Sequence, residues 1–234
     1  MDTSPPIEGV TRKIRILGSA CALGGPDAGC AEGPDELVRL ARSDLPGLDW
    51  PHASWGPVLR AQAAEGEPLS LIAELCGRLA RHTCAAVRQG EIPVVLGGDH
   101  SCAVGTWSGV ARALGPRGPL GLIWIDAHMD SHTPQTSPSG LAHGMPLAAL
   151  LGFGDRRLTE CMGGGPRVAA PHVCVIGVHD FEPEEARLLK QLGAHLFSMA
   201  DIRRRGLGAI LDEAIALVRK SVTDLPLQFK NFRD

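Results

Sequence analysis

The sequence predicts an α/β fold with three layers, α/β/α, in which a mainly parallel, doubly wound sheet is covered by helices on both sides. Short apolar runs that suit strands recur along the chain and alternate with longer segments of helical periodicity. Glycine and proline mark the boundaries between these segments. The 234 residues, 44% of them hydrophobic, are sufficient to bury one sizeable core.

Apolar runs bounded by turn-forming residues predict the strands. In chain order these are residues 13–19, 92–96, 120–125, 173–178 and 194–197, with a further candidate at residues 225–229. The runs at 120–125 and 173–178 are apolar throughout, which is typical of strands that are buried on both faces of a parallel sheet.

Helices are expected between these strands. Pro34 suits the first position of a short helix that starts after Gly33. Residues 70–89 carry leucines at helical spacing, and Gly90 suits the end of that helix. Three further helices are predicted at residues 102–114, 184–192 and 207–220.

The domain organisation follows from these elements. Residues 13–234 are expected to form a single α/β domain, and residues 1–12 a disordered N-terminal segment. Residues 50–68 are rich in glycine, proline and small polar residues, so they are expected to form a long loop.

Chemistry-bearing residues follow two of the predicted strands. Asp126, His128 and Asp130 come directly after the strand at 120–125, and in an extended segment all three would point to one side. His100 follows the strand at 92–96, and if the two strands are neighbours it reaches the same edge of the sheet. Carboxylates with imidazoles suit Mn²⁺ or another first-row divalent ion.

A single motif of this kind is more often a loop or helix-capping carboxylate than a metal ligand, but two in one chain favour a metal. Three motifs together resemble the ureohydrolase family of arginases, agmatinases and formiminoglutamases, and bacterial-type arginases most. They are residues 97–100 (Gly-Gly-Asp-His), 126–130 (Asp-Ala-His-Met-Asp) and 137–144 (Ser-Pro-Ser-Gly-Leu-Ala-His-Gly). The likeness runs from about residue 14 to about residue 227, with the motifs in the family's order and spacing.

The resemblance implies an arginase/deacetylase-like fold and manganese-dependent hydrolysis of a C–N bond in a linear amidine. A hydroxide generated on two Mn²⁺ ions would convert L-arginine to L-ornithine and urea. Carried over by motif, His100, Asp126 and Asp130 would bind one ion, and Asp126 and His128 the other. His143 would be catalytic as a proton shuttle, together with Asp130.

The same resemblance implies a substrate site. The loop before His143 would bind the α-amino and α-carboxylate groups of the substrate. Two acids at the start of the helix near residue 184 would hold the α-amino group, although glutamate stands at 182 where the family has aspartate. The expected substrate-binding residues are His132, Ser137, Ser139, Glu182 and Glu185.

The C-terminal part lacks the family's third metal-binding motif, an Asp-x-Asp pair. Aligned by Pro226, Phe232 stands at the bridging aspartate and Asp234 at the second one. The leading interpretation is an arginase-like hydrolase whose sequence has been shortened. The alternatives are an inactive relative that binds a metal or another subunit, and a ureohydrolase for another guanidino compound such as agmatine.

Composition narrows the class of protein. The formal charge of −3 argues against nucleic acid as a partner, and no apolar run reaches the roughly 18 residues that span a membrane. Seven cysteines without paired spacing indicate reduced thiols and a cytoplasmic location. The resemblance implies a small guanidino substrate as the partner and leaves a homo-oligomer open.

Overall fold

The computed structural model describes residues 12–42, 52–61, 66–115, 119–164 and 167–221. Every strand pairing within the named strands of these residues is parallel. The first sheet has the order β2-β1-β3 and the second the order β4-β5-β6. Their bounds are Ile14–Ser19 (β1), Ala53–Leu59 (β2), Ile92–Gly97 (β3), Leu122–Ile125 (β4), Val173–Val178 (β5) and His195–Ser198 (β6).

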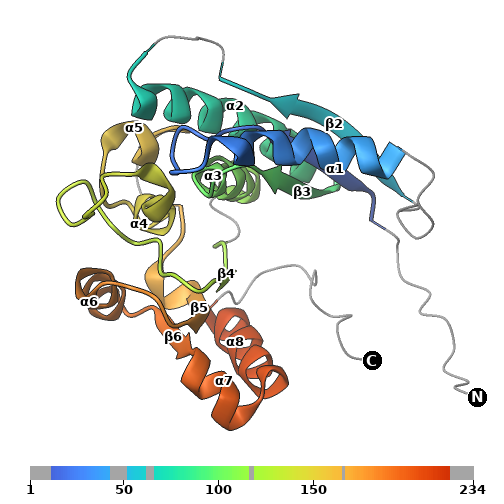
Figure 1. Cartoon of the computed structure of the whole chain (residues 1–234). Coiled ribbons are helices and arrows are strands. Elements are labelled where there is room, and N and C mark those ends of the chain that lie inside the picture. The colour runs from blue at the N-terminus through green and yellow to red at the C-terminus, as the bar shows by residue number, and fades with distance from the viewer. Residues whose placement is uncertain (1–11, 43–51, 62–65, 116–118, 165–166, 222–234) are drawn as a thin grey trace, which may run out of the picture.

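Helices connect and cover these strands, as Figure 1 shows. Their bounds are Gly33–Arg42 (α1), Pro68–Arg88 (α2), Cys102–Leu114 (α3), Pro146–Leu150 (α4), Arg156–Thr159 (α5), Pro183–Leu192 (α6), Met199–Arg205 (α7) and Leu207–Ser221 (α8). The predicted helices and parallel strands are therefore present. The sequence did not indicate α4, α5 and α7, which are all seven residues or shorter.

The second sheet carries helices on both of its faces. Val173 and Val175 of β5 lie in one apolar cluster with residues of α4 and α6. Cys174 and Ile176 point the other way and pack in a second cluster with residues of α8. Because successive side chains of a strand face opposite sides, one fully buried strand joins both clusters. This sheet therefore has the three-layer arrangement that the sequence predicts.

The first sheet is covered by α2, which packs closely against α3. Leu75 and Leu79 of α2 lie in one cluster with Leu17 of β1. Glycines on α3 allow the two helices to approach: a Cβ on Gly105 would lie 2.6 Å from the carbonyl oxygen of Cys76. The long predicted helix therefore contributes to the core, and its close contact fixes the position of α3.

The expected long loop at residues 50–68 is wrong, because β2 lies within it. Pro57 and Gly56 weaken the strand pattern, yet β2 is an edge strand that pairs only with β1 among the described residues. Proline is tolerated at such an edge, because the missing N–H can face the side of the strand that has no partner strand. A Cβ on Gly56 would lie 2.6 Å from Cδ2 of Leu17, so this position also requires a small residue.

The strands before the two motifs are not neighbours in the described residues. There β3 pairs with β1 and β4 pairs with β5, so each has one unpaired edge. Ile125 at the end of β4 is 67% exposed, which contradicts the expected burial of that strand on both faces. The expected disordered segment and the predicted strand at 225–229 lie outside the described residues, apart from Arg12.

The contact between α2 and α3 gives a test of the fold. A Cβ on Gly109 would lie 1.9 Å from Oγ1 of Thr83 and 2.3 Å from the carbonyl oxygen of Ala80. We expect Gly109→Ala to lower the free energy of unfolding by about 1–3 kcal/mol or more through overpacking, as measured by urea denaturation. Gly33→Ala is the control, because a Cβ there meets nothing within 4 Å. Equal effects of the two substitutions would contradict the packing.

Candidate metal and substrate site

His100 is positioned by a tight turn that follows β3. The backbone N–H of Gly98 donates to the carbonyl of Ser19 (2.8 Å), and that of Asp99 donates to Cys21 (2.7 Å). A Cβ on Gly98 would lie 2.1 Å from the Cys21 oxygen, so glycine is required for this approach. The turn is therefore fixed against the segment that follows β1, and α3 begins just beyond it.

Asp126 and Asp130 reach the same place from the second sheet. The N–H of Asp126 donates to the carbonyl of Ile176 (3.0 Å), which extends the ladder between β4 and β5 by one residue. Asp130 has a φ of 47°, a left-handed backbone that is rare outside glycine and is often found at functional sites. Its carbonyl accepts the N–H of Leu147 at the start of α4 (2.8 Å), and this bond holds the conformation.

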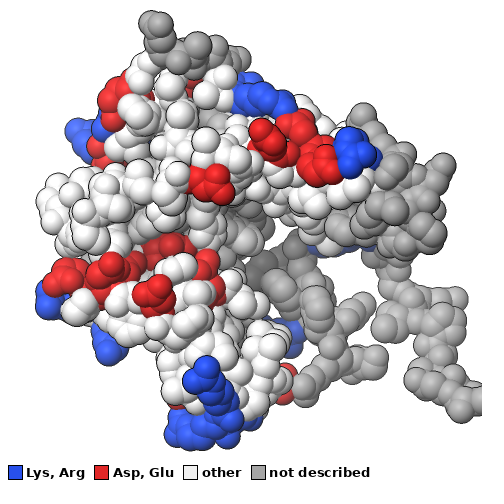
Figure 2. Space-filling model, in the orientation of Figure 1, with Lys and Arg blue, Asp and Glu red and all other residues white. Residues whose placement is uncertain are grey.

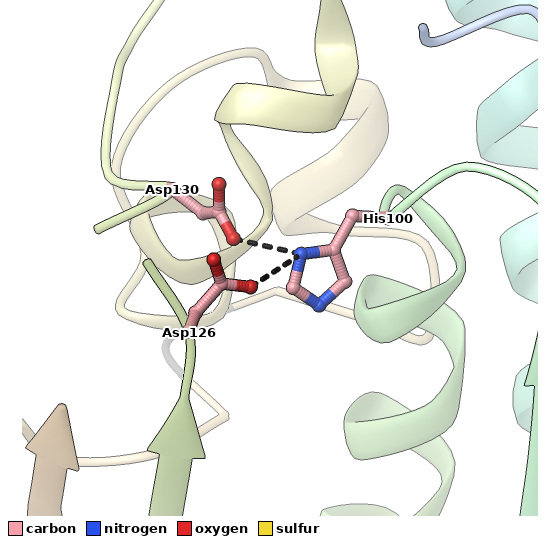
Figure 3. Close-up of side chains that lie close together, drawn as sticks. All are labelled: His100, Asp126 and Asp130. Atoms are coloured by element: carbon pink, nitrogen blue, oxygen red, sulfur yellow. Dashed lines mark ion pairs between the residues drawn. The ribbon is translucent and has the colours of Figure 1, made fainter. Parts of the chain in front are cut away.

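Both carboxylates point toward Nδ1 of His100, as Figure 3 shows. The distance from this nitrogen is 2.7 Å to Oδ2 of Asp130 and 3.5 Å to Oδ2 of Asp126. Asp130 is buried, and its Oδ2 has no other partner among the described residues. Two carboxylate oxygens and an imidazole nitrogen thus converge on one point, which fits the donors of a small divalent cation.

The electrostatics of His100 reflect this convergence. Burial lowers its pKa, but the hydrogen bond and charge of Asp130 and the charge of Asp126 raise it more, so the pKa lies above its ordinary value. The imidazole also stacks on the ring of Trp124, with the ring centroids 4.8 Å apart. This contact restricts the orientation in which His100 presents Nδ1.

His128 lies on the other side of Asp126. Its Nδ1 is 3.2 Å from Oδ1 of Asp126, whereas Oδ2 of the same carboxylate faces His100. Asp126 thus offers one oxygen to each histidine, the geometry that a bridging ligand needs. The sequence predicted that an extended segment would point Asp126, His128 and Asp130 to one side. That prediction is wrong, because residues 126–130 form no strand and the side chain of His128 is exposed.

A second group is formed by His132, Glu182 and Glu185. Nε2 of His132 lies 2.9 Å from Oε2 of Glu182 and 3.4 Å from Oε2 of Glu185. The two acids belong to the start of α6: Glu185 accepts the N–H of Glu182 (3.1 Å) and also that of Ser131 (3.0 Å). His132 thus contacts two acids of α6 that lie about fifty positions further along the sequence.

The charges in this group differ. Burial raises the pKa of the Glu185 carboxyl, although the donated N–H groups partly oppose that shift. The pKa of Glu182 is lowered, first by its hydrogen bond with His132. The three residues could hold a cation, but their polar atoms already satisfy one another, so the group resembles a polar pocket more than a vacant ligand set.

The serines and His143 lie on the segment before α4. Oγ of Ser137 accepts the N–H of Gly140 (3.0 Å), and Oγ of Ser139 accepts the N–H of Leu141 (3.2 Å). Ser139 is exposed and Ser137 is half-buried, and their two Oγ atoms lie 3.5 Å apart, so at least one hydroxyl proton remains available to a ligand. His143 lies in a 3₁₀ turn, and its N–H donates to the carbonyl of Gly24 (2.8 Å).

Acidic side chains are grouped on the face of the molecule that Figure 2 shows. They gather in a band over α6 and the segments that lead into it, in the orientation of Figure 1. Asp180 and Glu182, with 80% and 49% of their side chains exposed, contribute to this charge. A negative surface of this kind attracts cations, including a metal ion or a basic ligand.

Three residues around the site were missed by the sequence reasoning. Asp180 lies two residues beyond β5, and its Oδ2 is 3.7 Å from Nε2 of His128. Its place after a buried parallel strand was the signal that could have identified it. Trp124 and the carboxylate of Asp99 gave no such signal, because their roles depend on contacts between distant segments.

Comparison with known proteins supports these motifs. The model of the arginase family matches residues 12–225. The chain is 41% identical to arginase from Bacillus caldovelox over 152 residues, 65% of this chain and 50% of that protein. It is 33% identical to arginase-1 of Homo sapiens over 223 residues, 88% and 66% of the two chains.

Solved structures show the same relationship. Native Bacillus caldovelox arginase matches with a TM-score of 0.79 and 34% identity over 90% of this chain and 73% of that one. Arginase from Bacillus cereus gives 0.79 and 33% over 90% and 72%. The chain spans about half the length of the first curated relatives it matches. The family match over nearly the whole sequence, together with the three motifs, shows that this chain belongs to the arginase family.

Proposed function

We propose that this chain is an arginase-like hydrolase that converts L-arginine and water to L-ornithine and urea with the help of Mn²⁺. The observation that carries the proposal is the convergence of Asp126 and Asp130 on Nδ1 of His100. Membership of the arginase family supports the reaction type. A cytoplasmic location agrees with the seven cysteines, all of which are free.

The metal residues divide between two positions. His100, Asp126 and Asp130 would hold one ion, and Asp126 with His128 would hold the other through its second oxygen. Two Mn²⁺ ions would lower the pKa of a water molecule and so supply hydroxide for attack on the guanidinium carbon. The stacked ring of Trp124 and the left-handed backbone of Asp130 hold the donor atoms in place before any ion arrives.

Protons must then be moved within the site. The Asp130 carboxylate is buried beside His100, so it would be suited to orient a water molecule held at this group and to accept a proton from it. The imidazole of His143 makes no hydrogen bond with any side chain in the described parts of the chain, and is thus free to give a proton to the leaving amine. An imidazole exchanges protons readily near neutral pH.

The second group would hold the amino-acid end of arginine. The carboxylates of Glu182 and Glu185 suit the α-ammonium group, and the hydroxyls of Ser137 and Ser139 can donate to the α-carboxylate. His132 would orient Glu182, because its Nε2 already lies 2.9 Å from that carboxylate. Hydroxyls placed for a carboxylate favour arginine over agmatine, which has none.

One observation favours a second candidate, a ureohydrolase for another guanidino compound. His132 occupies the carboxylate pair that would otherwise meet the α-ammonium group. A guanidino acid, whose tail carries a carboxylate but no ammonium group, would leave this contact undisturbed.

The rates of turnover of arginine and of the alternative guanidino substrates distinguish these candidates. We expect urea release with arginine and Mn²⁺ to exceed that with agmatine, because only arginine uses both the acids and the serine hydroxyls. The measurement is colorimetric urea detection on the purified chain, with Asp126→Ala as the inactive reference. Faster release from agmatine or from a guanidino acid would favour the second candidate, and no release from any of the three would indicate an inactive relative.

Cation binding can be measured without activity. We expect Mn²⁺ to raise the melting temperature, since a ligand that binds only the folded state stabilises it by mass action, about 2.7 kcal/mol at 100 times its Kd. Asp126→Asn should weaken Mn²⁺ binding by more than the roughly 10–100-fold typical of an outer-shell partner. Asp155→Asn is the matched control, because that carboxylate pairs with Arg157 at the start of α5. Equal Mn²⁺ affinity in the Asp126 variant would refute the assignment.

The raised pKa of His100 predicts opposite effects of pH on stability and on cation binding. Without metal, protonated His100 stabilises the fold through Asp130; this contribution is complete below the ordinary pKa of 6.5 and is lost as pH rises through the higher folded pKa. Metal requires neutral imidazole, so Mn²⁺ affinity should rise over the same window. Urea denaturation in EDTA measures the pH dependence of the free energy of unfolding, and calorimetric titration with Mn²⁺ measures that of the affinity. The variant His100→Gln should remove the contribution of this histidine to both pH dependences.

A further inference from the structure

Asp99 is a buried carboxylate that belongs to neither of the two groups described above. Its Oδ1 accepts the N–H of Ser101 (2.9 Å), and its Oδ2 accepts the N–H of Gly24 (2.9 Å). Each oxygen therefore has its own backbone donor. A buried carboxylate with two such bonds is well satisfied, and it fixes both donors in position.

The bond to Gly24 continues to the proposed proton shuttle. The N–H of Gly24 binds Asp99, and its carbonyl accepts the N–H of His143 (2.8 Å). The backbone of Asp99 also binds this segment, because its N–H donates to the carbonyl of Cys21 (2.7 Å). Three segments that are far apart in the sequence are thus connected through one carboxylate and one glycine.

The space around Gly24 shows that this contact is close. A Cβ added to Gly24 would lie 2.9 Å from Oδ1 of Asp99. A Cβ added to Gly25 would lie 3.4 Å from the Cβ of Asp99. The segment therefore packs directly on the carboxylate, and any added atom would push the two apart. Movement of Gly24 would carry its carbonyl away from His143.

We propose that Asp99 is a positioning residue for His143, acting through Gly24. The neighbouring residue His100 supplies a proposed metal ligand, so one turn would align the metal position with the proton shuttle. The functional part of this inference rests on the proposed role of His143. The structural coupling between Asp99 and the His143 backbone does not depend on that role.

Amide hydrogen exchange on the whole chain tests the coupling directly. Asp99→Asn keeps the shape but has only one acceptor oxygen for two N–H donors. We expect the His143 amide to exchange faster by on the order of tenfold, the effect of losing one charge-assisted hydrogen bond. Gly24→Ala should act in the same direction from the other side of the contact, without altering the carboxylate.

Asp27→Asn is the matched control, because Asp27 also accepts a glycine N–H in the same loop region, that of Gly29 (2.8 Å), without contacting His143. It should leave the His143 amide unchanged. The amide of Val175 in β5 reports global opening and should also be unchanged in every variant. Unchanged His143 exchange in both test variants would overturn the proposal, as would equal acceleration at Val175.

Kinetics test the functional part. We expect Asp99→Asn to lower kcat for urea release while Mn²⁺ affinity and KM change little. Added to His143→Ala, it should cause no further loss, since its effect passes through that imidazole. Equal losses in both backgrounds would show that Asp99 acts through His100 instead. If the parent chain releases no urea, the proposed function fails, and the exchange measurements still decide the coupling.

Discussion

The convergence of Asp126 and Asp130 on Nδ1 of His100 is the constraint on which the site depends. The first sheet supplies His100 and the second supplies the aspartates, and no strand pairing joins the two sheets in the described residues. The contacts of His100 with Asp126 and Asp130 therefore join residues from two separate sheets. Two carboxylates so close together repel each other, and a positive charge between them, on the imidazole or on a bound cation, offsets that repulsion. A cation at this point would stabilise the site and the alignment of the two sheets together.

The first residues of α3 and α4, in addition to the ends of the strands, hold the donor atoms of His100 and Asp130 in position. α3 begins two residues after His100, and the first turn of α4 binds the carbonyl of Asp130. The two helices pack against each other, so the positions of the donors are linked through rigid elements. This arrangement explains how a residue in the left-handed region is retained: the hydrogen bond at the start of α4 offsets the backbone strain.

The sequence was sufficient to predict five of the six described strands and most helices, because these depend on local periodicity. Motifs with fixed spacing also named His100, Asp126 and Asp130, which the structure brings together. It did not predict β2, since Gly56 and Pro57 hide an edge strand whose pairing with β1 is not local. The same limit applies to strand order, which separates β3 from β4 in the described residues. The bond between His132 and Glu182, fifty residues apart, could be found only in three dimensions.

The two groups of the site differ in how far they are complete without a ligand. In the part of the chain that the structure describes, Oδ2 of Asp130 has His100 as its one partner, whereas each oxygen of Glu185 has a backbone donor. The group of His100, Asp126 and Asp130 is thus a candidate for completion by a cation, and loss of the imidazole would leave the Asp130 charge without a partner among the described residues. The group of His132, Glu182 and Glu185 is internally satisfied, and His132 contacts the Glu182 carboxylate directly. Substitutions that alter substrate preference are therefore expected around His132, and the metal residues are the part of the site least able to change.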